Sequence, residues 1–211
     1  MAQLRELKKQ QTRQKISHVA TLMFIEHGFE QTTIADIAKA SGVSKMTVTN
    51  YFPRKEDLFF DAYEEVVNGP SRTVAERAPG ESALAALRRK YLADCEEHAP
   101  LLGRFGPGFA RLVVESPALR ARLREIYDQQ EEALADTLIE EVGANGVAPR
   151  VATAQLSGVQ RVLFHEARRR VEAGQDEEEF FTGLAAAARE AFALLEPALA
   201  GYAVKQPRGG R

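Results

Sequence analysis

Residues 33–55 read TIADIAKASGVSKMTVTNYFPRK, and this segment predicts two short helices joined by a tight turn. The turn falls at residues 41–43, Ser-Gly-Val, where a glycine allows the sharp change of direction. Thr33 with Asp36 three residues later indicates a capping box at the start of the first helix, and Ser44 can cap the second. The segment therefore predicts a helix-turn-helix with both helices capped.

The second of these helices has one apolar and one polar face. Val48 and Phe52 are expected to point inward, and Pro53 ends the helix. The residues left mostly outward are Lys45, Met46, Thr47, Thr49 and Asn50. A stiff unit of this kind can place its second helix in the major groove of DNA.

The segment before it predicts another helix. Apolar residues recur at helical spacing from Ile16 through Ala20 to Phe24, and Gly28 suits the end of the helix. The rest of the chain also has helical periodicity, with expected helices at residues 55–67, 84–100, 117–142, 149–174 and 176–197. We expect the first of these to break, if it continues, at residues 68–70, and residues 101–115 to be kinked by their glycines.

The predicted fold is therefore all-α, with about nine helices. Residues 1–55 are expected to form an N-terminal three-helix helix-turn-helix DNA-binding domain, with residues 1–11 as a flexible arm. Residues 56–200 are expected to form a C-terminal helical ligand-binding and dimerisation domain. The Pro/Gly/Arg-rich tail, residues 201–211, is expected to be disordered.

Charge is unevenly distributed along the 211 residues, although the net charge is only −2. Residues 1–60 hold nine Lys and Arg against six Asp and Glu, whereas residues 61–211 hold nineteen against twenty-four. The basic excess would localise affinity for phosphate to one end. A lone cysteine, a polar N-terminus without a secretory signal and the lack of a long apolar run predict a cytoplasmic protein without a membrane partner.

The order and spacing of residues 13–60 resemble the DNA-binding domain of the TetR family of bacterial transcriptional regulators. The matching residues are Ala20, Phe24, Gly28, Phe29, Thr32, Thr33, Ile34, Ile37, Ala38, Gly42, Val43, Ser44, Lys45, Thr47, Tyr51, Phe52, Lys55, Glu56, Asp57 and Leu58. The remaining 150 or so residues resemble the family only as an all-helical body of the right length.

The resemblance and the chemistry of the residues together predict a DNA-contacting set. Its members are Thr33, Ser44, Lys45, Met46, Thr47, Thr49, Asn50, Tyr51 and Lys55. Thr33, Tyr51 and Lys55 are placed like the family's phosphate contacts, and Asn50 has the amide chemistry that pairs with adenine. The chain departs from the common family residues at Met46, Thr49 and Asn50, so its operator sequence cannot be transferred from a relative.

The resemblance also implies a small-molecule effector and a homodimer. Candidate ligand-binding residues in the body are Tyr91, Cys95, Phe105, Phe109, Leu112, Tyr127, Arg161, Phe164 and His165, with ordinary core packing as the alternative for the aromatic ones. The last two helices are expected to form the dimer interface through Val151, Ala154, Gly158, Val159, Val162, Phe181, Leu184, Ala188 and Phe192. Internal packing of a monomer is the alternative for this set.

The chain carries no pattern typical of an enzyme. It has no His and Cys spacing of a metal site, no Gly-rich phosphate loop and no nucleophile elbow, so we expect no catalysis, metal or cofactor. The function predicted is a homodimeric transcriptional regulator, a repressor that a small, largely apolar ligand releases from a palindromic operator. The alternative is a TetR-like DNA-binding protein controlled by a protein partner or by DNA alone; a helical enzyme is a remote one.

Overall fold

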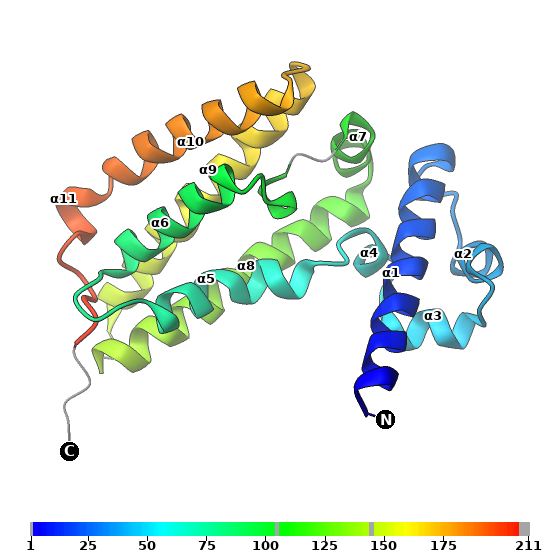
Figure 1. Ribbon diagram of the computed structural model, residues 1–211, viewed down its shortest axis with the longest axis horizontal. Helices are drawn as coiled ribbons and strands as arrows, with labels where there is room; N and C mark the ends of the chain where they lie inside the picture. The colour runs from blue at the N-terminus through cyan, green and yellow to red at the C-terminus, as the bar shows by residue number, and fades with distance from the viewer. Residues whose placement is uncertain (1, 104–105, 144–145, 207–211) are drawn as a thin grey trace. The chain divides into compact units, whose positions relative to one another are not determined.

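The computed structural model describes residues 2–103, 106–143 and 146–206, which form eleven α-helices and a short 3-10 helix, η1 (Figure 1). The elements are α1 (Ala2–His27), α2 (Ile34–Ser41), α3 (Lys45–Tyr51), α4 (Lys55–Phe59), α5 (Tyr63–Glu76), α6 (Ala83–Glu96), η1 (Pro100–Leu102), α7 (Pro107–Glu115), α8 (Pro117–Val142), α9 (Val147–Glu172), α10 (Glu177–Ala193) and α11 (Glu196–Leu199). The all-α prediction is confirmed. None of the described helices has both the length and the apolar character needed to cross a membrane.

The chain divides into two compact units. The N-terminal unit contains Met1–Tyr63 and Gly108–Leu123, and the helical body contains Glu64–Pro107 and Arg124–Arg211. The predicted boundary between residues 55 and 56 thus lies at the start of α4 rather than at the division itself. Residues 108–123 belong to the N-terminal unit because Leu112, Val113 and Leu119 are buried in the same core as α1 to α4.

The core of the N-terminal unit is built on the predicted apolar face of α1. Ile16, Ala20 and Phe24 are fully buried, and α1 packs against both α2 and α4. Val48 and Phe52 complete this core from α3 and the residue after it. Burial of so many large side chains under two short helices fixes α2 and α3, neither of which would be stable alone.

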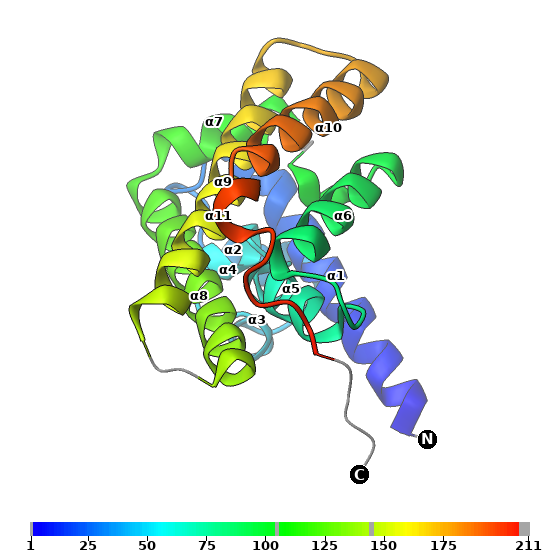
Figure 2. The same ribbon diagram turned by 90° about the vertical axis from the view of Figure 1, so that its left-hand side faces the viewer.

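The helical body has its core where α6, α9 and α10 pack side by side (Figures 1 and 2). Leu134 and Leu138 of α8 and Leu156 and Leu163 of α9 are buried in one cluster with Phe192 of α10. A second cluster of α6, η1, α9 and α10 side chains surrounds Phe180. The body is therefore a bundle in which the same chain covers the apolar side of α10.

The helix predicted at residues 55–67 is interrupted at residues 60–62, and the expected break at residues 68–70 is wrong. Helix α5 instead runs through Pro70. A proline inside a helix has no N–H to donate to the carbonyl four residues earlier, here Val66. The Nε2 atom of Gln130 donates to that carbonyl at 2.6 Å and replaces the missing bond, so the helix continues.

Both predicted flexible ends are ordered in part. Residues 2–11, expected as an arm, continue α1, because no proline or glycine interrupts the helix between Ala2 and His27. In the tail expected to be disordered, Val204 forms a β-bridge with Ser82. The N–H of Lys205 also donates to the carbonyl of Glu81 at 3.0 Å. Residues 207–211 lie outside the described residues.

Candidate functional site

Helix α2 is capped at both ends in the way the sequence predicts. The N–H of Asp36 donates to Oγ1 of Thr33 at 3.2 Å, and the N–H of Thr33 donates to Oδ2 of Asp36 at 3.2 Å. The hydroxyl and N–H of Thr33 lower the pKa of the Asp36 carboxyl by hydrogen bonding to its charged form. Gly42 has a φ of 69°, and the N–H of Val43 donates to the carbonyl of Ala38 at 3.0 Å. These contacts set the angle at which the chain enters α3.

Helix α3 presents its polar face to the exterior. Ser44 caps it by accepting from the N–H of Thr47 at 3.0 Å, and Val48 is fully buried beneath it. Lys45 and Asn50 are exposed on the opposite face. Met46 is 73% exposed, which is unusual for a large apolar side chain and suits contact with another molecule. The helix therefore offers a cation, an amide and an apolar group on one surface.

The two threonines of α3 use their hydroxyls within the helix. Oγ1 of Thr47 lies 2.8 Å from Oγ of Ser44, and Oγ1 of Thr49 donates to the carbonyl of Met46 at 3.1 Å. A hydroxyl bound to its own helix is less available to an outside acceptor. The group of Thr49 that has no such bond is its methyl, which suits contact with a thymine methyl rather than a phosphate.

The residues predicted to contact phosphate differ in their surroundings. Tyr51 is half-buried and packs against the core of the N-terminal unit. The Nζ atom of Lys55 lies 4.3 Å from the centroid of the Phe29 ring and donates to the carbonyl of Glu30 at 3.4 Å. Partial burial lowers the pKa of the Lys55 ammonium. Lys55 is thus pinned beside the end of α1 rather than extended into solvent.

Two ion contacts that the sequence does not predict stiffen this unit. Nη2 of Arg13 donates to the carbonyl of Asp61 at 2.8 Å, and its guanidinium lies 4.9 Å from the centroid of the Phe52 ring. Arg122 of α8 donates from Nε to Oδ1 of Asp57 at 2.8 Å, and both side chains are buried. No local signal in the sequence identifies the partner of Asp57, which lies 65 residues away.

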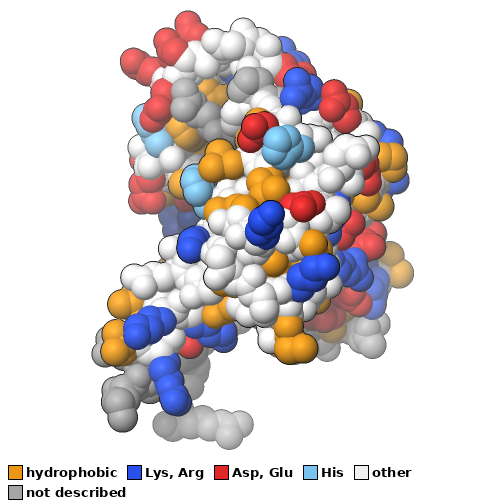
Figure 3. All heavy atoms as spheres, turned by 90° about the vertical axis from the view of Figure 1, so that its right-hand side faces the viewer, with side chains coloured by type: hydrophobic (Ala, Val, Ile, Leu, Met, Phe, Trp, Pro, Cys, Tyr) orange, Lys and Arg blue, Asp and Glu red, His pale blue; other side chains and the backbone are white. Residues whose placement is uncertain are grey.

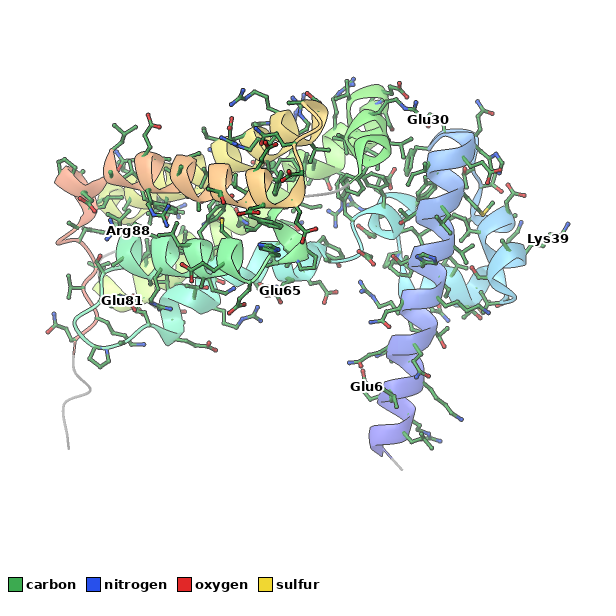
Figure 4. The ribbon with its side chains drawn as sticks, turned by 45° about the horizontal axis from the view of Figure 1, so that its top comes forward. Glu6, Glu30, Lys39, Glu65, Glu81 and Arg88 are labelled. Carbon is green, nitrogen blue, oxygen red and sulfur yellow. The ribbon has the colours of Figure 1, made fainter. Side chains whose placement is uncertain are left out.

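Positive charge is spread over the surface of the N-terminal unit. Figure 3 shows Lys and Arg side chains spread over this side, interspersed with exposed hydrophobic ones. Lys39 is exposed and points away from α2 (Figure 4). A cationic surface with exposed apolar groups on one helix suits the phosphates and base edges of a DNA groove.

The helical body contains a cavity of about 580 Å³ that is partly open to solvent. Its walls come from α5, α6, η1, α8 and α9. Three of the predicted ligand residues line it, namely Tyr91, Tyr127 and Phe164, and the rings of Tyr127 and Phe164 meet edge to face at 5.9 Å. The volume and the mixture of apolar and polar walls are typical of a small-molecule site.

Five other predicted ligand residues do not line this cavity. Phe109 and Leu112 belong to the core of the N-terminal unit, where Phe109 stacks on Phe59 at 4.1 Å. Helix α7 carries these two side chains toward that core and not to the wall of this cavity. Phe105 lies outside the described residues.

The remaining three are held elsewhere in the body. Cys95 is buried in a packed cluster, and burial raises the pKa of its thiol to about 11. Arg161 donates from Nη1 to Oε2 of Glu131 at 2.9 Å, as a salt bridge between α9 and α8. His165 is exposed. These three side chains therefore lie in the core, in a salt bridge and on the surface, respectively.

The residues predicted for the dimer interface separate into two groups. Phe181, Leu184, Ala188 and Phe192 of α10 are buried in the cores of the same chain, which leaves little of these side chains exposed for contact with a partner. Apolar spacing identified the buried face of α10 but not the helix that covers it. Val159 is half-buried and packs against the same cluster as Phe192.

The other interface residues share one exposed face of α9. Val151 is 48% exposed and Val162 is 61% exposed, and Ala154 lies on the surface between them. A Cβ atom at Gly158 would meet no atom within 4 Å. Val147, four residues before Val151, lies on the same face and is 76% exposed. We call this row of residues, from Val147 to Val162, the α9 stripe. The stripe is a row of small and branched apolar side chains that the described part of the chain leaves largely exposed.

Within the described parts of the chain, no group of three or more His, Cys, Asp and Glu side chains could hold a metal ion. Several charged side chains of the cavity wall form salt bridges, such as Lys90 with Asp94 and Arg89 with Glu81.

Comparison with known proteins gives a family match over the segment that contains the helix-turn-helix. Residues 16–62 match the family described as bacterial regulatory proteins, tetR family. The regulator AcrR of Shigella flexneri is 38% identical over 64 residues, which cover 30% of this chain and 30% of AcrR. The regulator TcmR of Streptomyces glaucescens is 26% identical over 178 residues, covering 77% of this chain and 76% of TcmR.

The fold of the whole chain also has solved counterparts. The structure of SmeT in complex with triclosan covers 93% of this chain and 95% of its own, with a TM-score of 0.59 and 17% sequence identity. At this identity the likeness shows the fold alone. It extends the agreement from the helix-turn-helix to the helical body.

Proposed function

Because the chain is a TetR-family DNA-binding transcriptional regulator and not an enzyme, we propose that it acts as a homodimeric repressor released from its operator by a small apolar ligand. The observation that carries the proposal is the polar face of α3, held outward by caps at Thr33 and Ser44 over a buried core. We place the protein with its DNA in the cytoplasm.

In this proposal α3 enters the major groove. Lys45 contacts a guanine edge or a phosphate, Asn50 contacts an adenine, and Met46 with the Thr49 methyl contacts a thymine methyl. Ser44, Tyr51 and Lys55, at or near the ends of α3, Thr47 within it and Thr33 at the start of α2 would contact phosphates and fix the register on the DNA backbone. One short helix reads few base pairs, so two copies on half-sites about 34–36 Å apart would supply the specificity.

The exposed α9 stripe supports the homodimer. An uncovered row of valines with a glycine at its centre allows two helices to approach closely about a two-fold axis. Since α10 is already covered by the chain's own core, we assign the closest contacts to α9. A dimer bound to a palindromic operator would repress by occupying the DNA. Repression of this kind requires no additional binding surface on the protein.

The cavity supports ligand release. SmeT was solved with triclosan, a small and largely apolar molecule, and a cavity of about 580 Å³ accommodates molecules of that size. The α5 wall of the cavity follows α4 in the chain after residues 60–62. A ligand that shifts α5 by binding would change the setting of α4, and a coupling of about 1–3 kcal/mol would suffice to release DNA.

Replacing Asn50 by alanine is expected to relax base preference at one position of each half-site while keeping most of the overall affinity. The reason is that loss of one bidentate contact removes about 1–3 kcal/mol of discrimination against the wrong base. Profiling the bound sequences of both proteins measures this. Gln129→Ala, which removes an exposed amide of α8, serves as the control. An unaltered profile for Asn50→Ala would argue against base reading by this residue.

Replacing Lys45 by alanine tests the DNA-binding face directly. Affinity should fall on specific and random DNA alike, and the slope of log affinity against log salt should drop by about one per site for a lost phosphate contact. Lys90→Ala, which removes a lysine of the body, should leave the slope unchanged. If both variants behave alike, α3 does not face the DNA.

A further inference from the structure

Two buried polar atoms of residues that line the cavity have no hydrogen-bond partner within the described chain. They are the hydroxyl oxygen of Tyr127 and the amide oxygen Oε1 of Gln130, both buried and both without a hydrogen bond. Both residues line the cavity and lie one turn apart on α8, and Gln130 is only 5% exposed. A buried polar group without a partner is costly, so its retention calls for an explanation.

The orientation of the Gln130 amide is set by Pro70. The carbonyl of Val66 loses its helical donor at Pro70, and Nε2 of Gln130 supplies one at 2.6 Å. A carbonyl oxygen can only accept, so the NH₂ group must face Val66 and the amide oxygen must face elsewhere. Gln130 therefore holds a fixed acceptor, and not a free donor, in the wall of the cavity.

The other residues of the cavity wall do not require a ligand to be charged. Tyr91, Leu102 and Phe164 provide apolar and aromatic surface. The charged wall residues carry both signs, and most of them form salt bridges, as Glu65 (labelled in Figure 4) does with Arg72. Burial raises the pKa of the Tyr127 hydroxyl, so it stays neutral and can donate or accept.

We propose that the ligand of this cavity is an uncharged apolar or aromatic molecule with an O–H or N–H donor that bonds to Oε1 of Gln130. The hydroxyl of Tyr127, one turn away, bonds to the same polar group or to one beside it. This inference rests on the ligand response proposed above and names its chemical class. The Gln130 side chain would also link the ligand to α5. Its amide oxygen accepts from the ligand, while its NH₂ group donates to the carbonyl of Val66 on α5.

The test uses two probes that share their rings and differ in the donor: 4-hydroxybiphenyl and 4-methoxybiphenyl. Calorimetric titration of the full-length protein without DNA should give at least about tenfold tighter binding of the phenol, since a buried acceptor left unpaired disfavours the ether. Equal affinities, or no binding of the phenol, would overturn the proposal. Either result with operator binding intact would leave the proposed DNA-binding function standing.

Variants separate the donor requirement from stability. Tyr127→Phe keeps the ring against Phe164 and removes the unpartnered hydroxyl. It should raise the melting midpoint of the ligand-free protein by about 2–4 °C and reduce the preference for the phenol. A lower midpoint would show that the hydroxyl is satisfied in the free protein and would contradict the proposal.

Gln130→Met should abolish the preference for the phenol and lower the midpoint, because Val66 loses its donor. The double variant Gln130→Met with Pro70→Ala restores a backbone N–H four residues after Val66. It should regain the midpoint but not the preference. Recovery of both would assign Gln130 a purely structural role and overturn the inference.

Discussion

Replacing Arg122 by alanine is expected to lower the free energy of unfolding by about 3–5 kcal/mol, because a buried carboxylate is left without its partner. Nε of Arg122 lies 2.8 Å from Oδ1 of Asp57, and the two side chains are 6% and 5% exposed. The guanidinium also lies 4.8 Å from the centroid of the Tyr63 ring. Its removal therefore costs packing as well as charge compensation.

Urea denaturation followed by circular dichroism measures the effect of Arg122→Ala. Arg124→Ala, an exposed neighbour on α8, is the matched control and should stay within about 0.5 kcal/mol of the native protein. The double variant Asp57→Leu with Arg122→Met removes both charges and should recover most of the loss. A change below about 1 kcal/mol for Arg122→Ala would mean that water, not Arg122, compensates Asp57.

Replacing Val162 by glutamate is expected to dissociate the proposed dimer. Two-fold symmetry would bring two new carboxylates into an apolar interface, and burying an unpaired charge there is unfavourable by several kcal/mol. Val162 is 61% exposed and is the most exposed of the three valines predicted for the interface on α9. Affinity for a palindromic operator should fall at least about 100-fold, because each half-site then binds a separate monomer.

Light scattering coupled to size-exclusion chromatography measures the mass of the Val162→Glu protein at micromolar concentration. Val114→Glu provides the control, since Val114 of α7 is a similarly exposed valine, at 47%, outside the α9 stripe. That variant should keep the mass of the native protein. A native-like dimer for Val162→Glu would remove the α9 stripe from the interface.

The helix-turn-helix is predictable from sequence because its signals are local. Thr33 and Asp36 cap one helix, Ser44 caps the next, and Gly42 takes the positive φ that the turn requires. Each of these effects acts within four residues, and the apolar spacing of α1 supplies the core beneath them. Nothing distant has to be known to place the polar face of α3 outward.

The parts that escaped prediction depend on which surfaces meet. Periodicity shows that Phe181 and Phe192 share the apolar side of one helix, but not that the same chain covers that side. It likewise cannot assign Phe109 to one core or the other, because in the chain its segment follows elements of the body and leads into a long helix, α8, that contributes to both units. Pro70 does indicate a free carbonyl at Val66, yet only the tertiary fold identifies Gln130 as its donor.

The central claim is that two copies of α3 read a two-fold symmetric DNA site. Selection of bound duplexes from a random pool by the native protein, followed by sequencing, tests it most directly. The proposal predicts an enriched palindrome whose half-sites are separated by about one helical turn of DNA or more. Enrichment of a single asymmetric site, or no enrichment above random sequence, would contradict it.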